Sequence, residues 1–358
     1  MRLRNYGCRV SDAYTFHGYK AVIIENELLR IGILVDKGTD IFEFVYKPLD
    51  LDFMWRNPLG FRNPDRFIPT VAAGGGSFTD YYFGGWQEIF PVGGWTTEYK
   101  GAEFGLHSET PLLPWKPQII LDTEEEVAVK FSVRTVRSPY SLVKTLRLKA
   151  NEAILHIDET VTNEGEEEMH FMWGHHPAFG GRFLDENCVI DVPAKNIESA
   201  KDPSPGNRVA PGEFSPWPMI KRADGLGKVD LSIIPPKSDR SMDMCFLTDL
   251  EAGWYALTNQ KLQTGFGMTW DHNFFKHIWY WMVFGGAYGY PSYGRYYTLA
   301  LEPWTSYATA GGFHQILKEG GAVRIAPGAS ISTSMKAIAY TGVTGVKSIS
   351  PEGIVTGK

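Results

Sequence analysis

Alternating apolar and polar residues run through the middle of the chain and predict β-strands. In segment 126–136 the apolar positions are Val127, Val129, Phe131 and Val133, and polar or small residues stand between them. Such alternation is typical of strands buried on one face only. It continues through 142–148 and 153–161 up to a turn at Asn163-Glu164-Gly165. Because no 3.6-residue periodicity of similar length competes with it, we predict an all-β protein built from antiparallel sheet.

The same pattern occurs on both sides of this region. Residues 20–35 predict two strands around Glu25-Asn26-Glu27, residues 36–38 a turn, and residues 41–46 a third strand. A segment rich in Pro and Gly occupies about 200–240, after which an aromatic strand series resumes without a shift in composition. We therefore expect one domain over 1–358, with 200–240 as a surface insertion rather than a linker.

Two adjacent histidines, His175 and His176, follow an alternating apolar run within the stretch 170–180. Side chains alternate between the faces of a strand, so His175 is expected on the apolar face and His176 on the opposite face, beside Gly174. Pro177 lacks an N–H, so the strand ladder is expected to break there. Glu302-Pro303, at the end of an apolar run, repeats this arrangement. The alternative is a pair of structural histidines and a structural carboxylate.

Composition narrows the possible partners. The chain contains 17 Tyr, 11 Trp, 21 Phe and 38 Gly, which favours strands and turns, and flat aromatic rings can also stack on sugars. A net charge of −6 gives no electrostatic case for binding nucleic acid or an anionic membrane. The three cysteines are far apart and odd in number, which favours reduced thiols in a cytoplasm. Residues 1–20 have no apolar core and no stretch of the sequence is long and apolar enough for a membrane span, so we expect neither a secretory leader nor a spanning segment.

Candidate chemistry is also found between residues 83 and 109. Glycine pairs flank the segment Trp86-Gln87-Glu88, which suggests a backbone packed closely against a ligand or another strand. Glu88 is a candidate catalytic or hydrogen-bonding carboxylate. His107 and Glu109, two residues apart, are expected on one strand face. Arginines occur in the loop 55–67, where Arg56 and Arg66 are interpreted as solvated.

In this order, the motifs resemble the aldose 1-epimerase (galactose mutarotase-like) family. The resemblance covers most of the chain and rests on Gly-Gly-Trp-Gln-Glu-Ile-Phe-Pro at 84–91, Leu-His-Ser-Glu at 106–109, His-Pro-Ala-Phe at 176–179, Asp243, Leu-Glu-Pro-Trp at 301–304 and a final Pro-Gly-Ala turn. It implies a β-supersandwich of two large curved antiparallel sheets with an open concave sugar-binding cleft.

The resemblance also implies roles for individual residues. Glu302 corresponds to the general base and His176 to the general acid, on opposite sides of a bound sugar ring. His107 and Asp243 correspond to groups that position the sugar, and Arg62 resembles the arginine of an early loop. We add Glu88, Trp86 and Trp304 as candidate sugar contacts. The family often has Asn before the catalytic histidine and Tyr two residues after it; His175 and Ala178 stand there, a departure that concerns sugar specificity.

The implied reaction suits these residues. Interconversion of aldose anomers requires removal of the anomeric hydroxyl proton and protonation of the ring oxygen, which a carboxyl group and an imidazole can perform near neutral pH. No cofactor is required, and the chain has no dinucleotide or P-loop fingerprint. The expected partner is a small sugar.

Four alternatives remain open from the sequence. A metal-dependent lyase or hydrolase would use His107, Glu109, His176 and Glu302 as ligands. A carbohydrate-binding module would keep the cleft without the chemistry. A retaining glycosidase would need the carboxyl groups of Glu88 and Glu302 about 5 to 5.5 Å apart. A sugar-phosphate epimerase would need arginines such as Arg62 and Arg66 to converge on a phosphate.

Overall fold

The computed structural model describes residues 4–65, 76–202, 204, 206–307 and 312–358, and most of its regular structure is β-sheet. The predicted all-β class is thus confirmed. Arg66 lies outside the described residues.

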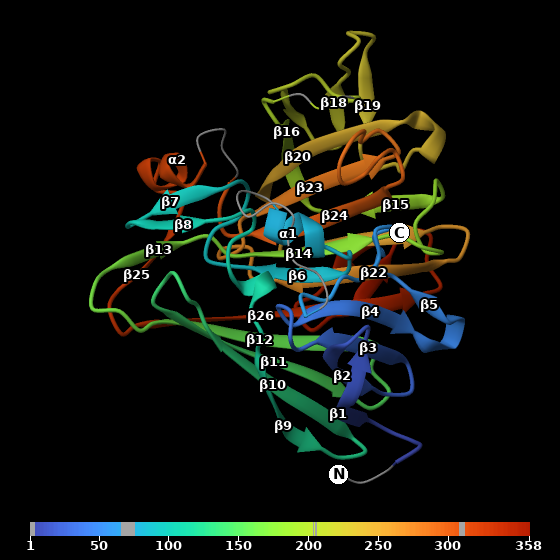
Figure 1. Ribbon diagram of the computed structural model, residues 1–358. Coiled ribbons are helices and arrows are strands. Elements are labelled where there is room, and N and C mark those ends of the chain that lie inside the picture. The colour runs from blue at the N-terminus through green and yellow to red at the C-terminus, as the bar shows by residue number, and fades with distance from the viewer. Residues whose placement is uncertain (1–3, 66–75, 203, 205, 308–311) are drawn as a thin grey trace.

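Twelve strands form one antiparallel sheet that crosses the molecule (Figure 1). Its strands lie in the order β1-β2-β3-β4-β6-β14-β24-β23-β20-β16-β17, and β5 pairs with β4. Their bounds are β1 (Arg9–Phe16), β2 (Tyr19–Glu25), β3 (Leu29–Leu34), β4 (Asp40–Tyr46), β5 (Leu51–Asp52), β6 (Trp86–Ile89), β14 (Gly174–Phe179), β16 (Ala194–Ser199), β17 (Phe214–Pro216), β20 (Ser241–Leu250), β23 (His277–Phe284) and β24 (Tyr297–Trp304).

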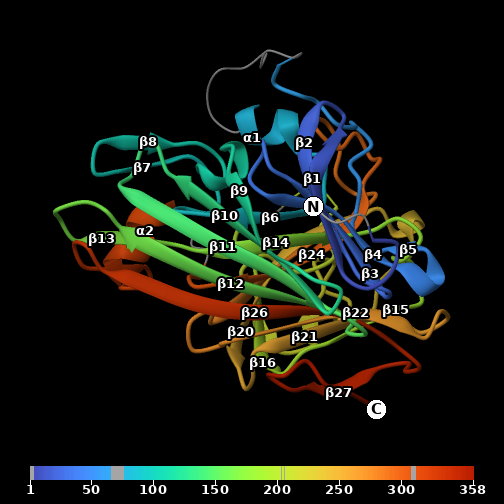
Figure 2. The same ribbon diagram turned by 90° about the horizontal axis from the view of Figure 1, so that it is seen from below.

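A second antiparallel sheet of eight strands packs against the first. Figure 2 shows its strands β10, β11, β12 and β26 side by side. The strand order is β15-β21-β22-β26-β12-β11-β10-β9. The bounds are β9 (Lys116–Asp122), β10 (Glu126–Arg134), β11 (Tyr140–Lys149), β12 (Ile154–Asn163), β15 (Cys188–Asp191), β21 (Trp254–Asn259), β22 (Thr264–Trp270) and β26 (Ser330–Thr341).

Short elements complete the described part of the chain. Two-stranded ribbons are β7 (Thr97–Tyr99) with β8 (Ala102–Phe104), β13 (Met169–Phe171) with β25 (Val323–Ile325), β18 (Met219–Lys221) with β19 (Lys228–Asp230), and β27 (Val346–Ile349) with β28 (Val355–Gly357). Helices are α1 (Gly76–Tyr81), α2 (Gly312–Lys318) and the 3₁₀ turns η1 (Lys47–Leu49), η2 (Thr110–Leu112) and η3 (Lys237–Asp239). None of the described helices has the length and apolar character needed to cross a membrane.

The strands predicted from alternation coincide with those observed. The opening strands are β2, β3 and β4, and the central ones are β10, β11 and β12. The Pro- and Gly-rich segment 200–240 is only partly the predicted surface insertion. Its strand β17 extends the edge of the twelve-stranded sheet, whereas β18 and β19 form a separate ribbon. The assignment of 1–358 to one domain stays a prediction.

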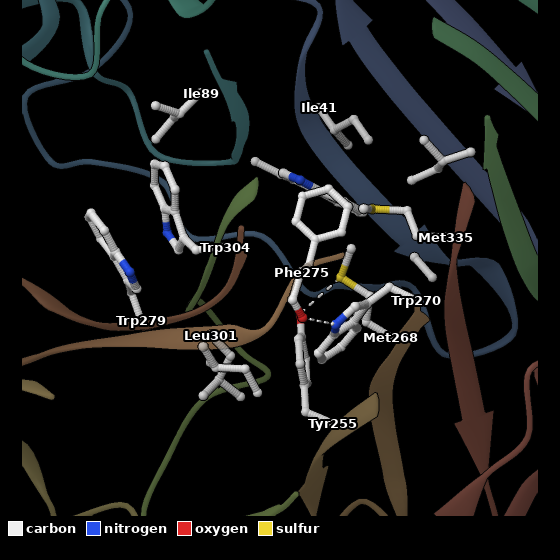
Figure 3. Close-up of a cluster of buried hydrophobic side chains, with 14 of the residues drawn as sticks. Ile41, Ile89, Tyr255, Met268, Trp270, Phe275, Trp279, Leu301, Trp304 and Met335 are labelled. Atoms are coloured by element: carbon white, nitrogen blue, oxygen red, sulfur yellow. Dashed lines mark hydrogen bonds between the residues drawn. The ribbon is translucent and has the colours of Figure 1, made fainter. Parts of the chain in front are cut away.

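The main hydrophobic core joins the two sheets. Phe266 of the eight-stranded sheet contacts Phe44 and Phe179 of the twelve-stranded sheet, with ring centroids 5.2 Å and 4.9 Å apart. Figure 3 shows another part of this core, in which the Trp270 indole donates a hydrogen bond to the Phe275 carbonyl. Burial of this much apolar surface is the dominant stabilising term for such a sandwich.

A smaller hydrophobic cluster lies on the other face of the twelve-stranded sheet. Trp55, Phe78, Tyr82, Val283 and Tyr296 are among its buried members. Phe78 lies in α1 and Tyr82 directly follows it, so this cluster holds α1 against the sheet, in front of β14 and β6 in Figure 1. The sheet therefore has packed side chains on both faces, which explains its near-continuous apolar strands.

The prediction that strands end beside His176 and Glu302 is wrong. β14 continues through Pro177, which pairs with Trp86 of β6, and β24 continues through Pro303, which pairs with Ile278 of β23. Between β14 and β24 the paired residues are Gly174 with Trp304 and Ala178 with Ala300, on either side of the proline positions. Each proline is compatible with an extended strand but has no N–H group to donate. The two strands therefore stay adjacent with fewer backbone hydrogen bonds between them at this point.

Two glycines make room for the Trp304 ring. A Cβ atom at Gly174 would lie 2.2 Å from Trp304 Cδ2, and one at Gly93 would lie 2.2 Å from its outer ring edge. On the remaining side the ring stacks on Trp279 at 4.1 Å (Figure 3). The glycine pairs flagged in the sequence thus allow close packing against protein side chains and backbone.

We predict that Gly174→Ala destabilises the protein by about 1 to 3 kcal/mol, because the new methyl group forces Trp304 out of its slot. Urea unfolding followed by circular dichroism measures this loss. Gly345→Ala is the control, since a Cβ there meets mainly the flexible Lys358 side chain. Equal unfolding midpoints for both variants would contradict this account of the packing.

Candidate active site

His176 and Glu302 meet on the face of the twelve-stranded sheet that carries the smaller cluster. Gly174 pairs with Trp304 and Ala178 with Ala300, so the antiparallel register puts His176 opposite Glu302. His176 Nε2 lies 3.4 Å from Glu302 Oε1. The sequence brings these two groups together as expected, but they are in direct contact rather than separated by the width of a sugar ring. A ligand that engages both groups must therefore approach them from one side.

Glu302 is held in place by an indole. Trp304 Nε1 donates a hydrogen bond of 3.0 Å to Glu302 Oε2, which leaves Oε1 facing His176. Trp304 was expected as a sugar contact, but its ring is fully buried between Trp279 and the two glycines. Its observed contact is with the carboxyl group, and it acts on the site by orienting Glu302.

Aromatic side chains enclose the pair. The Tyr82 ring lies 5.6 Å from the His176 ring, and the half-buried Trp281 ring also lies 5.6 Å from it. Only 6 % of His176 and 2 % of Glu302 is exposed. Neither aromatic residue was predicted from the sequence. The two-residue spacing of Trp279 and Trp281 could have indicated that they share a face, whereas nothing local marks Tyr82.

Burial shifts the two pKa values in opposite directions. It raises the pKa of Glu302 to about 8, partly offset by the hydrogen bond from Trp304. It lowers the pKa of His176 to about 4. Both shifts arise because burial makes the charged form of each group costly. Between about pH 4 and pH 8 the pair therefore holds one titratable proton. A group that can give a proton and a group that can take one are thus in contact at neutral pH.

His107 is the second imidazole of the site. Its ring lies 5.8 Å from the His176 ring and 4.6 Å from Phe78. The Gly94 backbone N–H donates to His107 Nδ1, so in the neutral ring Nε2 carries the hydrogen. Burial, followed by the influence of His176, lowers the pKa of His107 to about 3. His107 is therefore a neutral hydrogen-bond donor beside the acid–base pair.

The expectation that His107 and Glu109 share a strand face is wrong. His107 and Ser108 both have left-handed backbone conformations, with φ of 58° and 63°, so the chain turns there. Glu109 instead accepts hydrogen bonds from the backbone N–H groups of Val136 and Arg137. Left-handed non-glycine residues cost on the order of 1 kcal/mol or more and occur preferentially at functional sites.

Trp86 and Glu88 point away from the site, which corrects their assignment as sugar contacts. They lie on the core face of β6, as His175 does on β14. Trp86 Nε1 donates to His175 Nδ1, and His175 Nε2 lies 3.0 Å from Glu159. The expectation that His175 and His176 face opposite ways is confirmed.

Glu88 belongs to a buried charged network. Lys144 Nζ donates to it at 2.8 Å and Trp173 Nε1 at 3.0 Å. Burial raises the pKa of Glu88, the neighbouring Glu159 adds to that shift, and Lys144 opposes it. Because Glu88 and Glu302 lie on opposite faces of the sheet, the retaining-glycosidase alternative is excluded.

Asp243 also lies on the opposite face. It pairs with Met282 of β23, the position next to Trp281, so its side chain points to the other side of the sheet from His176. Both carboxylate oxygens are used, because Oδ2 accepts from the Arg208 side chain at 2.8 Å and Oδ1 from the Arg208 backbone at 2.8 Å. We therefore omit Asp243 from the candidate site. In this structure it anchors the loop around residue 208.

The predicted arginines behave differently from one another. Arg62 is half-buried, and its guanidinium lies 3.4 Å from the Asp80 carbonyl in α1. Within the described part of the chain, its side chain forms no hydrogen bond or ion pair with His176 or Glu302. Arg56 is exposed and pairs with Asp52 at 3.0 Å, in line with its interpretation as a solvated residue.

A metal centre built from the four predicted ligands does not form. Glu109 is turned to the 136–138 turn, and among the described residues no group of three or more His, Cys, Asp or Glu side chains is arranged to hold a metal ion. His107, His176 and Glu302 remain together as hydrogen-bonding and proton-transfer groups.

Comparisons with known proteins agree with the fold. The sequence model of a family described as a domain of unknown function, DUF4432, matches residues 16–338. A comparison with curated protein sequences gave no match. Among solved structures, one described as a "putative aldose 1-epimerase" from Klebsiella pneumoniae has a TM-score of 0.70 at 16 % identity, over 93 % of this chain and 83 % of that one.

A galactose mutarotase related enzyme from Lactobacillus acidophilus has a TM-score of 0.60 at 16 % identity, covering 90 % of this chain and 97 % of its own. A galactose mutarotase-like protein from Lactobacillus casei has a TM-score of 0.59 at 13 % identity, covering 89 % and 100 %. The chain therefore has the sandwich fold of galactose mutarotase-like proteins, as the sequence motifs implied. Identities this low establish the fold alone.

We predict that Lys144→Met destabilises the protein by about 3 to 5 kcal/mol, because it leaves Glu88 buried without its cation. Adding Glu88→Gln to Lys144→Met should recover a large part of the loss, since the pair is then removed together. Chemical unfolding of the wild type, both single variants and the double variant measures the coupling. Purely additive losses would contradict a direct ion pair in the core.

Proposed function

The chain belongs to the DUF4432 family, and we propose that it is an isomerase of the aldose 1-epimerase type that interconverts the anomers of a free aldose or a closely related sugar. The observation that carries this proposal is the buried contact between His176 Nε2 and Glu302 Oε1 at 3.4 Å. The sandwich fold shared with mutarotase-like proteins supports the proposal. The sequence resemblance also assigns the acid and base positions to His176 and Glu302.

In the proposed mechanism the pair exchanges protons with the sugar twice, once when the ring opens and once when it closes. In ring opening, one group removes the proton of the anomeric hydroxyl while the other protonates the ring oxygen. In the open-chain sugar, rotation about the bond between the carbonyl carbon and its neighbouring carbon exposes the other face of the carbonyl group. The two proton transfers then run in reverse and close the ring on that face. The pair returns to its starting protonation, so each of Glu302 and His176 acts as both acid and base within a turnover.

The contact geometry suits this exchange. The anomeric oxygen and the ring oxygen are bonded to the same carbon, so a sugar can present both to two groups that lie side by side. The pKa directions put the resting proton on Glu302, whereas the resemblance assigns it to His176. These are the two positions of a single shared proton, and a turnover passes through both.

Neighbouring groups supply binding. We assign His107 Nε2–H as a donor to a sugar oxygen, because its Nδ1 already accepts from Gly94. The half-buried Trp281 ring offers an apolar surface against which a sugar face can stack. The transfers need no cofactor. Buried free thiols at Cys8, Cys188 and Cys245 support a cytoplasmic location.

We predict that Glu302→Gln and His176→Asn each lower the catalysed rate by at least about 100-fold, because each removes one proton-transfer group. Polarimetry or anomeric-proton NMR of freshly dissolved α-anomers, over a panel of aldoses, measures the rate above the spontaneous background. His156→Asn, which changes a histidine paired with Glu152 in the other sheet, is the matched control. Wild-type activity in both site variants would overturn the proposal.

We also predict a bell-shaped pH profile for kcat/KM, with limbs near pH 4 and pH 8. Below the lower limb both groups carry protons and no base remains; above the upper limb both have lost them and no acid remains. Trp304→Phe removes a donor that lowers the pKa of Glu302, so the upper limb should move to higher pH. A background-corrected rate that keeps rising above pH 9 would contradict this assignment.

A further inference from the structure

The acid–base pair belongs to a row of side chains that runs straight across five strands. Gln87 of β6 pairs with His176, and Glu302 pairs with Trp279 of β23. On the other side, the pairing of Ile41 with Trp86 places Asp40 of β4 opposite Gln87. Paired residues of antiparallel strands share a face, so the buried side chains of Asp40 and Gln87 continue the polar row beyond His176.

The amide of Gln87 has a fixed orientation. Its Nε2 donates one hydrogen bond to the Gly84 carbonyl at 2.7 Å and another to Asp40 Oδ2 at 3.1 Å. Both partners are acceptors, so the NH₂ group must face them and Oε1 must face the other way. Asp40 is itself held by Lys37, whose ammonium lies 2.5 Å from the same Oδ2.

This leaves one strong acceptor open. Gln87 is 0 % exposed, and its Oε1 has no hydrogen-bond partner among the described residues. Buried polar atoms without a partner are rare because they lose water without replacement, so each one requires an explanation. Asp40 Oδ1 is also unpartnered, but it lies against Gly38 rather than along the row.

We propose that Gln87 is a specificity-determining residue, whose Oε1 accepts a hydrogen bond from a sugar hydroxyl group next to the reacting end of the substrate. The inference rests on the proposed function, because it takes the ligand at His176 and Glu302 to be a sugar. Across neighbouring strands, paired side chains are about 5 Å apart at Cβ, which puts Gln87 within reach of an atom one or two bonds from the anomeric carbon.

The chemistry of the row selects the class of group that can bind there. An amide oxygen accepts and cannot donate, so it favours a hydroxyl and disfavours a phosphate or carboxylate oxygen, which would leave it unpaired. Lys37, the cation that contacts the row at Asp40, is 3 % exposed and already paired with Asp40. The substrate therefore carries an uncharged hydroxyl at this position.

The test compares the preferred aldose of the panel with its monodeoxy derivatives. For the wild type, one derivative should show a KM about tenfold higher at similar kcat, because it lacks the donor to Oε1. In Gln87→Met the parent sugar should show the same tenfold rise, and that derivative should lose no further affinity. Gln87→Asn, which withdraws the amide by one methylene group, should give the same pattern and serves if Gln87→Met does not fold.

Asn259→Leu is the matched control. Asn259 is another fully buried amide that donates to backbone and carboxylate oxygens, but it lies in β21 of the other sheet. It should lower stability but keep the wild-type discrimination among the derivatives. Unchanged discrimination in the Gln87 variants, for every derivative, would overturn the inference while leaving the isomerase proposal intact.

Failure of the isomerase proposal gives a different result. If the wild type does not accelerate anomer exchange, calorimetric titration with the same sugars replaces kinetics. A tenfold difference in Kd between parent and one derivative, lost in the Gln87 variants, would support the role of Gln87 without the catalysis. Equal Kd values, or no binding of any sugar, would overturn it.

Discussion

The opposite orientation of two neighbouring histidines on β14 is the constraint on which the site depends. His175 is tied into the core by the Trp86 indole and Glu159, and this fixes which way the next side chain must point. A slip of one residue would exchange the two imidazoles between core and site. The buried network on the core face of the sheet thus determines which imidazole reaches Glu302, although its members point away from Glu302.

The second requirement is that β14 and β24 stay adjacent where both carry a proline. Pro177 and Pro303 lack the N–H groups that would tie the strands together, yet each strand is held by its outer neighbour, β6 or β23. Trp304 completes the arrangement, because its indole sits in the space left by Gly93 and Gly174 and hydrogen-bonds Glu302. The strand register therefore puts His176 opposite Glu302, and the packing of Trp304 holds the Glu302 carboxyl group in place.

Most of the correct predictions came from the two-residue alternation of apolar and polar side chains along the strands. It located the opening and central strands, separated His175 from His176, and, with the ordered motifs, identified Glu302 as the partner. It failed where the backbone leaves the regular strand: the left-handed residues at 107 and 108 turned Glu109 away from His107. It also could not tell faces apart between distant strands, so Asp243 and Glu88 were assigned to the wrong side. Tyr82 reaches His176 only through the docking of α1, which no local pattern encodes.

The order of strands in the large sheet has a consequence for how the protein acquires activity. The row that crosses the candidate site draws on β4, β6, β14, β24 and β23, so residues far apart in the chain must be in register before the proposed proton transfer is possible. Such long-range pairing is slow, because the chain loses the entropy of loop closure before the stabilising contacts between the strands form. Regain of the proposed activity during refolding would thus report the pairing of these five strands, and a fragment that lacks β24 also lacks Glu302.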